Sequence, residues 1–144
     1  MTKIWVIAAD SWRARLFSAD SPAGKITEVR TLVNPEARLR EGELITDTGG
    51  GGQALGGASR HIFNQPSEKE HQENLFARQV AEEIEQLRRE GKLDRVYVVA
   101  EPRFLGRLRE NYSRELQKRV GVEVPRHVTA QSPARIRELL PFRI

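Results

Sequence analysis

Ile4-Trp5-Val6-Ile7-Ala8-Ala9 is apolar at every position and ends at Asp10. A short run without polar alternation predicts a strand that is buried on both faces. Asp10-Ser11 supplies turn chemistry and residues 13–18 have the composition of a second strand, so the two strands are expected to form an antiparallel hairpin. After a turn at Ser21–Gly24, a third strand over residues 26–33 extends the hairpin into a three-strand meander.

The second half of the chain alternates helical and strand patterns. Ser67 and Glu70 form a capping box that begins a helix, and Gly91 is placed to end it. The apolar face of this helix is expected to comprise Leu75, Phe76, Val80, Ile84 and Leu87. Residues 95–100 then predict a buried central strand.

Three further elements are expected near the C-terminus, after a short helix that begins at Pro102. Ser113 is placed to cap a helix that carries Leu116 and Val120 and stops at Gly121. A last strand follows over residues 122–128, and Ser132-Pro133 begins a final helix. The order predicts an α/β protein: an antiparallel three-strand meander followed by βα units, in one mixed sheet with helices on its faces.

Composition and length limit the function classes. The 144 residues fit one domain, 1–144, in which residues 35–66 show no helical or strand periodicity and are expected to form a long flexible loop. The chain has no cysteine and no apolar run of bilayer-spanning length, so we expect a cytoplasmic protein without a membrane segment. The formal net charge of +4, with arginine in excess, raises the odds of a nucleic-acid partner without establishing one. Without a P-loop or dinucleotide fingerprint, no cofactor is expected.

Residues 49–57, Gly-Gly-Gly-Gly-Gln-Ala-Leu-Gly-Gly, are the most unusual part of the predicted loop. Such a glycine-rich stretch does not hold a helix or strand by itself, because each glycine loses much backbone entropy on ordering. Two interpretations stay open from composition alone. The stretch is either a flexible tether, or a loop that presents backbone amides and the Gln53 side chain to a partner.

Several segments resemble the bacterial family called "protein required for attachment to host cells". The most specific is Ala100-Glu101-Pro102-Arg103-Phe104-Leu105-Gly106, which runs from a strand end into a helix. The other matching segments are Trp5–Asp10, Ala14–Phe17, Asn34–Arg38, Gly57–His61 and Glu70-His71. This family in turn is similar to the middle domain of archaeo-eukaryotic class-1 peptide release factors, which has a ribonuclease H-like mixed sheet.

The release-factor resemblance implies a function for the glycine-rich segment. In that domain a Gly-Gly-Gln loop follows the opening strands and precedes a long helix, and Gly51-Gly52-Gln53 has the same place here. The resemblance implies a ribosome-associated protein that promotes peptidyl-tRNA ester hydrolysis. Gln53 would position water, and its backbone amide would stabilise the developing oxyanion. In contrast to release factors, we expect no codon-reading domain and no partner-binding domain here, since the 144 residues fit one domain.

Basic residues near the loop are candidates for contacts with ribosomal or other structured RNA. Two pairs flank the glycine-rich segment, and a further pair lies one helical turn apart after the central strand: Arg38 and Arg40, Arg60 and His61, Arg103 and Arg107. Arginines spaced in this way can follow a phosphate backbone. The alternative for the helical pair is a solvated helix face with ordinary ion pairs.

Two other functions compete with the release-factor hypothesis. The first is a non-enzymatic interaction module in host-cell attachment or stress. The second, a metal-dependent nuclease, would use Asp10 as a metal ligand, but the hairpin-turn role of Asp10 is favoured, and His61, His71 and His127 lack metal-ligand spacing. No metal is therefore expected. Trp12 either packs at the edge of the core or stacks on a base. The sequence leaves the oligomeric state open.

Overall fold

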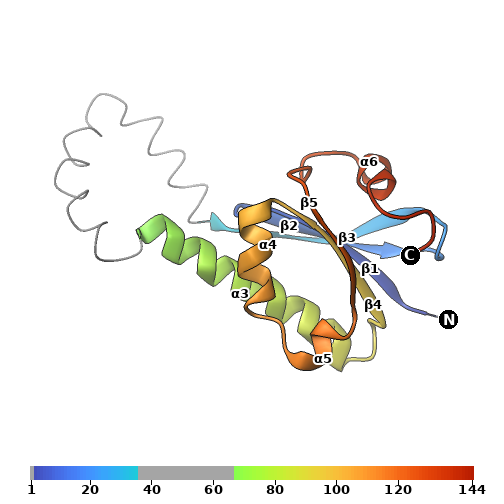
Figure 1. Cartoon of the computed structure of the whole chain (residues 1–144), viewed down its shortest axis with the longest axis horizontal. Helices are drawn as coiled ribbons and strands as arrows, with labels where there is room; N and C mark the ends of the chain where they lie inside the picture. Colours follow the sequence, from blue (N-terminus) through green and yellow to red (C-terminus); the bar gives the residue numbers. More distant parts are fainter. Residues whose placement is uncertain (1, 36–66) are drawn as a thin grey trace.

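The structure is a computed structural model, and it describes residues 2–35 and 67–144. Its described strands form one mixed sheet in the order β3-β2-β1-β4-β5 (Figure 1). The strands are β1 Ile4–Ala9, β2 Arg13–Ala19, β3 Ile26–Val33, β4 Arg95–Ala100 and β5 Val120–Pro125. The β1-β2 and β2-β3 pairs are antiparallel, and the β1-β4 and β4-β5 pairs are parallel. An antiparallel meander joined to parallel strands in this order is the ribonuclease H-like arrangement, so the predicted fold class is confirmed.

Strand β1 lies at the centre of the sheet, as its unbroken apolar run predicts. Five of its six residues are buried, and only Trp5 is partly exposed. The indole Nε1 of Trp5 donates a hydrogen bond of 2.8 Å to the carbonyl of Lys92, so its polar edge is satisfied. Ala9 pairs with Ala14 on β2 and with Ala100 on β4. The ends of these strands therefore meet at one edge of the sheet.

Helices cover both faces of the sheet (Figure 1). Helices α3 Glu68–Arg89, α4 Pro102–Arg109 and α5 Arg114–Gln117 cover one face, where Phe76, Val80 and Leu116 pack into one buried cluster. Helix α6 Pro133–Glu138 and the C-terminal residues cover the other face, where Ile136, Leu140 and Ile144 join Phe17 and Val99. Among the described helices, none is long and apolar enough to cross a membrane.

The long helix α3 begins and ends where the sequence predicts. The Ser67 hydroxyl accepts a hydrogen bond of 3.1 Å from the Glu70 amide, and Gly91 after the helix has a φ of 71°, which favours glycine. The prediction that Leu75 belongs to the apolar face is wrong, because its side chain is 44% exposed. Glu73 is buried instead and makes an ion pair with Arg107 of α4.

The boundary between α5 and β5 differs from the prediction. Helix α5 ends at Gln117, and Val120 and Gly121 belong to β5, which ends at Pro125 rather than at Val128. Gly121 is not a helix stop. A Cβ atom there would lie 2.4 Å from the Tyr97 ring, so this close approach of β5 to Tyr97 requires glycine.

Candidate functional site

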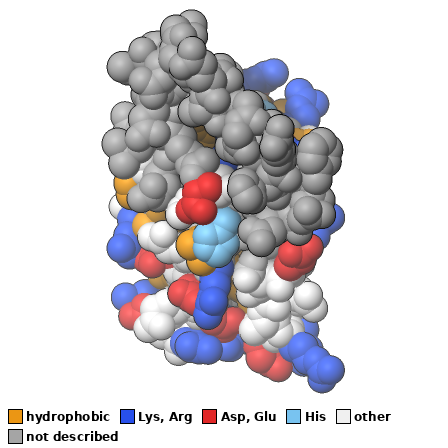
Figure 2. Space-filling view, turned by 90° about the vertical axis from the view of Figure 1, so that its left-hand side faces the viewer, with side chains coloured by type: hydrophobic (Ala, Val, Ile, Leu, Met, Phe, Trp, Pro, Cys, Tyr) orange, Lys and Arg blue, Asp and Glu red, His pale blue; other side chains and the backbone are white. Residues whose placement is uncertain are grey.

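The carboxyl ends of the parallel strands meet at one edge of the sheet and carry polar side chains. Asp10 directly follows β1, Glu101 directly follows β4, and His127 lies two residues beyond β5. In open α/β sheets, ligands bind outside the carboxyl ends of parallel strands. The surface viewed from this side carries Lys and Arg side chains interspersed with acidic ones around a histidine (Figure 2).

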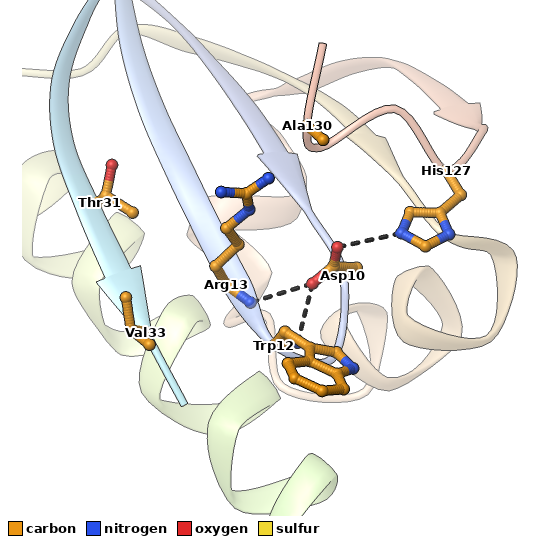
Figure 3. A pocket seen from close by; sticks show the side chains of 7 residues that line it. All are labelled: Asp10, Trp12, Arg13, Thr31, Val33, His127 and Ala130. Atoms are coloured by element: carbon orange, nitrogen blue, oxygen red, sulfur yellow. Dashed lines mark hydrogen bonds and ion pairs between the residues drawn. The ribbon is translucent and has the colours of Figure 1, made fainter. Parts of the chain in front are cut away.

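Asp10 uses both of its carboxylate oxygens within the protein. Its Oδ1 accepts hydrogen bonds from the amides of Trp12 at 2.8 Å and Arg13 at 3.0 Å, so the predicted hairpin-turn role is confirmed. Its Oδ2 lies 3.1 Å from Nε2 of His127 (Figure 3). Because a carboxylate oxygen accepts hydrogen bonds, a hydrogen bond at this contact requires the tautomer of His127 with its proton on Nε2, in which Nδ1 is an acceptor.

Arg15 anchors the connection that carries His127. Its Nη1 donates hydrogen bonds of 2.6 Å to the carbonyls of Thr129 and Gln131. Its Nη2 makes an ion pair of 2.8 Å with Glu28 on β3, and the guanidinium lies over the Phe17 ring at 5.1 Å. The Arg15 hydrogen bond holds the pKa of Glu28 below its usual value. One side chain from the middle of the sheet therefore fixes the position of residues 127–131.

A hollow of about 590 Å³ lies between the sheet and this connection (Figure 3). Its lining residues come from the β1-β2 turn, from β2 and β3, and from the connection after β5: Asp10, Trp12, Arg13, Thr31, Val33, His127 and Ala130. Within the described part of the chain, the Arg13 guanidinium makes no ion pair, whereas Arg15 beside it is fully engaged. The hollow therefore combines an aromatic ring, an imidazole and an available cation.

Glu101, the polar residue after β4, serves as a helix cap. Its two oxygens accept hydrogen bonds from the amides of Arg103 at 2.9 Å and Phe104 at 3.0 Å. It therefore caps the first turn of α4, in which Phe104 packs against Phe76 with ring centroids 5.8 Å apart. Capping of α4 therefore explains why a glutamate stands in the segment Ala100–Gly106, and no catalytic role is needed.

Most residues of the predicted RNA-binding and catalytic set lie outside the described residues: Gly51, Gly52, Gln53, Arg38, Arg40, Arg60 and His61. Arg103 is described and exposed in the first turn of α4. Arg107 is largely covered: it makes a 3.4 Å ion pair with Glu73 and hydrogen-bonds to Asn74. Arg107 thus ties α4 to α3, in keeping with the ion-pair alternative.

Strand β3 ends at the same edge of the sheet, where Val33 pairs with Arg13 of β2. Asn34, directly after β3, donates from its amide to the Trp12 carbonyl at 2.7 Å and from its side chain to the Ser11 carbonyl at 3.1 Å. The side chain of Asn34 is buried. The end of β3 is therefore fixed to the turn that carries Asp10.

Over residues 2–35 and 67–144, no group of three or more His, Asp or Glu side chains is arranged to hold a metal ion. Among the described residues, the two Asp10 oxygens contact the amides of Trp12 and Arg13 and the imidazole of His127. Two-metal nuclease chemistry needs several converging carboxylates. The described residues therefore give the nuclease alternative no support.

The sequence pattern does not show that Asp10, Arg13 and His127 line one hollow. The missed signal was topological, because Asp10 and His127 each follow a strand that the βα pattern makes parallel. The carboxyl ends of such strands meet at one edge. Arg13 gave no signal of its own in an arginine-rich chain.

The fold defines this chain as an α/β protein with a ribonuclease H-like sheet. By sequence, it belongs to the family described as "protein required for attachment to host cells", whose model matches residues 5–140. The family resemblance is therefore confirmed, and the release-factor resemblance stays a prediction. A search of curated protein sequences finds no match.

Among solved structures, the chain is similar to the type II variant of the Aquifex aeolicus Ppx/GppA phosphatase, with 21% identity and a TM-score of 0.42. A second structure of the Aquifex aeolicus member of the Ppx/GppA family has 21% identity and a TM-score of 0.41. In both comparisons 86% of this chain is covered, but it spans only 35% of the other protein's length.

Proposed function

We propose that this chain is a release-factor-like protein that binds the ribosome or structured RNA and promotes peptidyl-tRNA ester hydrolysis. One observation carries the proposal. The segment with Gly51-Gly52-Gln53 runs between β3 and α3 of a ribonuclease H-like sheet, which is the place of the Gly-Gly-Gln loop in the release-factor middle domain. On this proposal the protein works in the cytoplasm.

The proposed reaction is hydrolysis of the ester between the peptide and the 3′ end of tRNA. The water oxygen attacks the ester carbonyl carbon, and the bond to the tRNA oxygen breaks. The products are a peptide carboxylic acid and a tRNA 3′-hydroxyl, which takes the proton. Gln53 orients the water, and its backbone N–H stabilises the negative charge on the carbonyl oxygen. Glycines on both sides allow close approach in a crowded RNA site.

Phosphate contacts from arginine side chains would hold the protein on RNA. Arg38, Arg40, Arg60 and His61 flank the Gly-Gly-Gln segment in sequence, and Arg103 is exposed on α4. The ion pair of Arg107 with Glu73 makes Arg107 the weakest member of the proposed set. Binding that depends on several phosphate contacts should fall steeply as salt is raised.

The test measures peptide release from ribosomes loaded with peptidyl-tRNA, using the full chain. Gln53→Ala and Gly52→Ala should abolish release while the thermal unfolding midpoint stays unchanged. Gln86→Ala, which alters an exposed glutamine on α3, is the matched control and should release peptide like the wild type. Equal release by the wild type, Gln53→Ala and Gly52→Ala would refute the proposal.

A non-enzymatic interaction module is the second candidate, favoured by the description of the family. In that case the glycine-rich segment is a linker or binds a protein partner. Co-sedimentation with ribosomes at several salt concentrations separates the two functions. The release-factor proposal requires binding at low salt that weakens as salt rises. An absence of binding at low salt would favour the interaction module.

A further inference from the structure

We propose that the hollow lined by Asp10, Trp12, Arg13, Thr31, Val33 and His127 binds one nucleotide of single-stranded RNA. The base would lie against Trp12 and Val33, and the phosphate would lie on Arg13. This inference rests on the proposed function, because it names an RNA contact for the same protein. It concerns described residues alone and does not involve the Gly-Gly-Gln segment.

The size and position of the hollow suit a single nucleotide. Its volume of about 590 Å³ falls within the roughly 300–1,000 Å³ of small-ligand sites. It lies on the α6 face of the sheet, because Ala14 and Leu32 point into the cluster under α3, while Arg13, Thr31 and Val33 alternate with them. Figure 3 shows Thr31 and Val33 on one side and His127 on the other.

The apolar part of the hollow can hold a base. Trp12 is partly exposed, and its indole N–H makes no hydrogen bond within the described part of the chain. Val33, which is also on the wall, is 40% exposed. An aromatic face beside an aliphatic surface accepts any base by stacking, so single-stranded nucleic acids bind such platforms with little sequence preference.

The charges around the hollow favour an anion at Arg13. The nearby carboxylates are already engaged: Glu28 pairs with Arg15, and Asp10 accepts two backbone amides and faces His127. Arg13 is the lining residue that carries a permanent positive charge, and it makes no ion pair with a described residue. The lowered pKa of Glu28 is due chiefly to the Arg15 hydrogen bond, and the charge of Arg13 contributes only a minor part. A planar guanidinium donates two parallel hydrogen bonds to a phosphate.

His127 adds a directed polar contact at the opposite wall. The Asp10 carboxylate fixes the imidazole through Nε2, and the side chain is 63% exposed, so Nδ1 is accessible to a ligand. Nδ1 can accept a hydrogen bond from a ribose hydroxyl or a base amino group. Arg15 acts only as a positioning residue, because it holds the connection that carries His127 through the carbonyls of Thr129 and Gln131.

The test measures binding of fluorescein-labelled eight-nucleotide oligo(U) and oligo(A) RNAs to the full chain by fluorescence anisotropy. Trp12→Leu and Arg13→Gln should each weaken binding about tenfold or more, and Trp12→Phe should weaken it less because it keeps a stacking ring. Arg78→Gln removes the same charge from an exposed site on α3 and should change the affinity less than twofold. Circular dichroism melting confirms that each variant is folded.

Competition with unlabelled AMP and UMP distinguishes a free nucleotide from a strand as the source of the ligand. Displacement by the mononucleotides supports a self-contained nucleotide site, and displacement only by oligonucleotides supports a site that needs neighbouring phosphates. Equal weakening by Arg13→Gln and Arg78→Gln, or unchanged affinity in Trp12→Leu, would overturn the inference.

The two proposals fail in different ways. Peptide release that depends on Gln53, combined with unchanged oligonucleotide affinity in the Trp12 and Arg13 variants, would remove the nucleotide site and keep the proposed function. Oligonucleotide binding that is lost in those variants, combined with no peptide release by the wild type, would keep the site and remove the proposed hydrolysis.

Discussion

Replacing Arg15 with Met should loosen the connection that forms one wall of the hollow. Arg15 has a side chain only 12% exposed and donates to two backbone carbonyls, at 2.6 Å each, besides pairing with Glu28. Met keeps an unbranched apolar side chain and removes the guanidinium, so the variant loses these hydrogen bonds, the ion pair and the contact over the Phe17 ring.

The expected loss follows from those contacts. Removing a hydrogen bond from a charged donor costs about 1.5–3 kcal/mol when the acceptor is left buried. Thr129 is 1% exposed, so its carbonyl bears the full cost, whereas Gln131 is exposed and its carbonyl regains water. The partly exposed Glu28 pair adds less than about 1 kcal/mol. We therefore expect Arg15→Met to reduce the free energy of unfolding by about 2–4 kcal/mol.

Urea unfolding measures the global effect, and hydrogen exchange measures the local one. The Gln131 amide donates to the Val128 carbonyl at 2.9 Å, and its exchange should accelerate in Arg15→Met. Arg135→Met removes an exposed arginine that pairs with Glu138 and should cost less than about 0.5 kcal/mol. A loss below 0.5 kcal/mol for Arg15→Met, with unchanged exchange at Gln131, would refute the reasoning.

Three further predictions concern single contacts. Gly121→Ala should destabilise the protein by about 1–3 kcal/mol in urea unfolding, because the added Cβ would lie 2.4 Å from the Tyr97 ring. This loss should be smaller in a Tyr97→Leu background, which lacks the ring. An equal loss in both backgrounds would contradict the steric explanation. Glu101→Ala should reduce the free energy of unfolding by about 1 kcal/mol, because it removes the acceptor of two α4 amides, and Glu101→Asp should lose less. Identical thermal melting of the wild type, Glu101→Ala and Glu101→Asp would argue against the capping role. Because Arg15 lowers the folded-state pKa of Glu28 from its ordinary 4.5, the stabilisation from Glu28 is complete above pH 4.5 and is lost as pH falls through the lowered pKa. The stability difference between the wild type and Glu28→Gln should therefore decrease from pH 6 to pH 3, and an increase would contradict that direction.

The elements with local signals could be predicted from the sequence. The apolar run at Ile4–Ala9 gave β1, because only a strand in the centre of a sheet buries both faces. Ser67 and Ser132 gave two helix starts, since their hydroxyls accept hydrogen bonds from amides three residues on. The end of α5 was missed because Val120 fits a helical apolar spacing as well as the start of a strand.

The candidate site depended on contacts that no local pattern contains. Asp10 and His127 are 117 positions apart in sequence, yet their side chains lie 3.1 Å apart. Arg13 and Arg15 both lie on β2. Arg15 makes an ion pair with Glu28 and hydrogen bonds to two carbonyls, whereas Arg13 lines the hollow. Spacing along the chain could not distinguish them.

The sequence by itself determined the order of strands and helices, because periodicity and caps are properties of neighbouring residues. Its motifs carried the resemblance to the family, and that resemblance implied the ribonuclease H-like class of the sheet. Only the tertiary structure decided which polar side chains contact other residues of the protein and which can contact a ligand. Parallel pairing of β1, β4 and β5 gathers Asp10, Glu101 and His127 at one edge, and packing then engages Glu101 as a cap and Arg107 in an ion pair. Whether a charge is free for a ligand depends on which residues surround it in space.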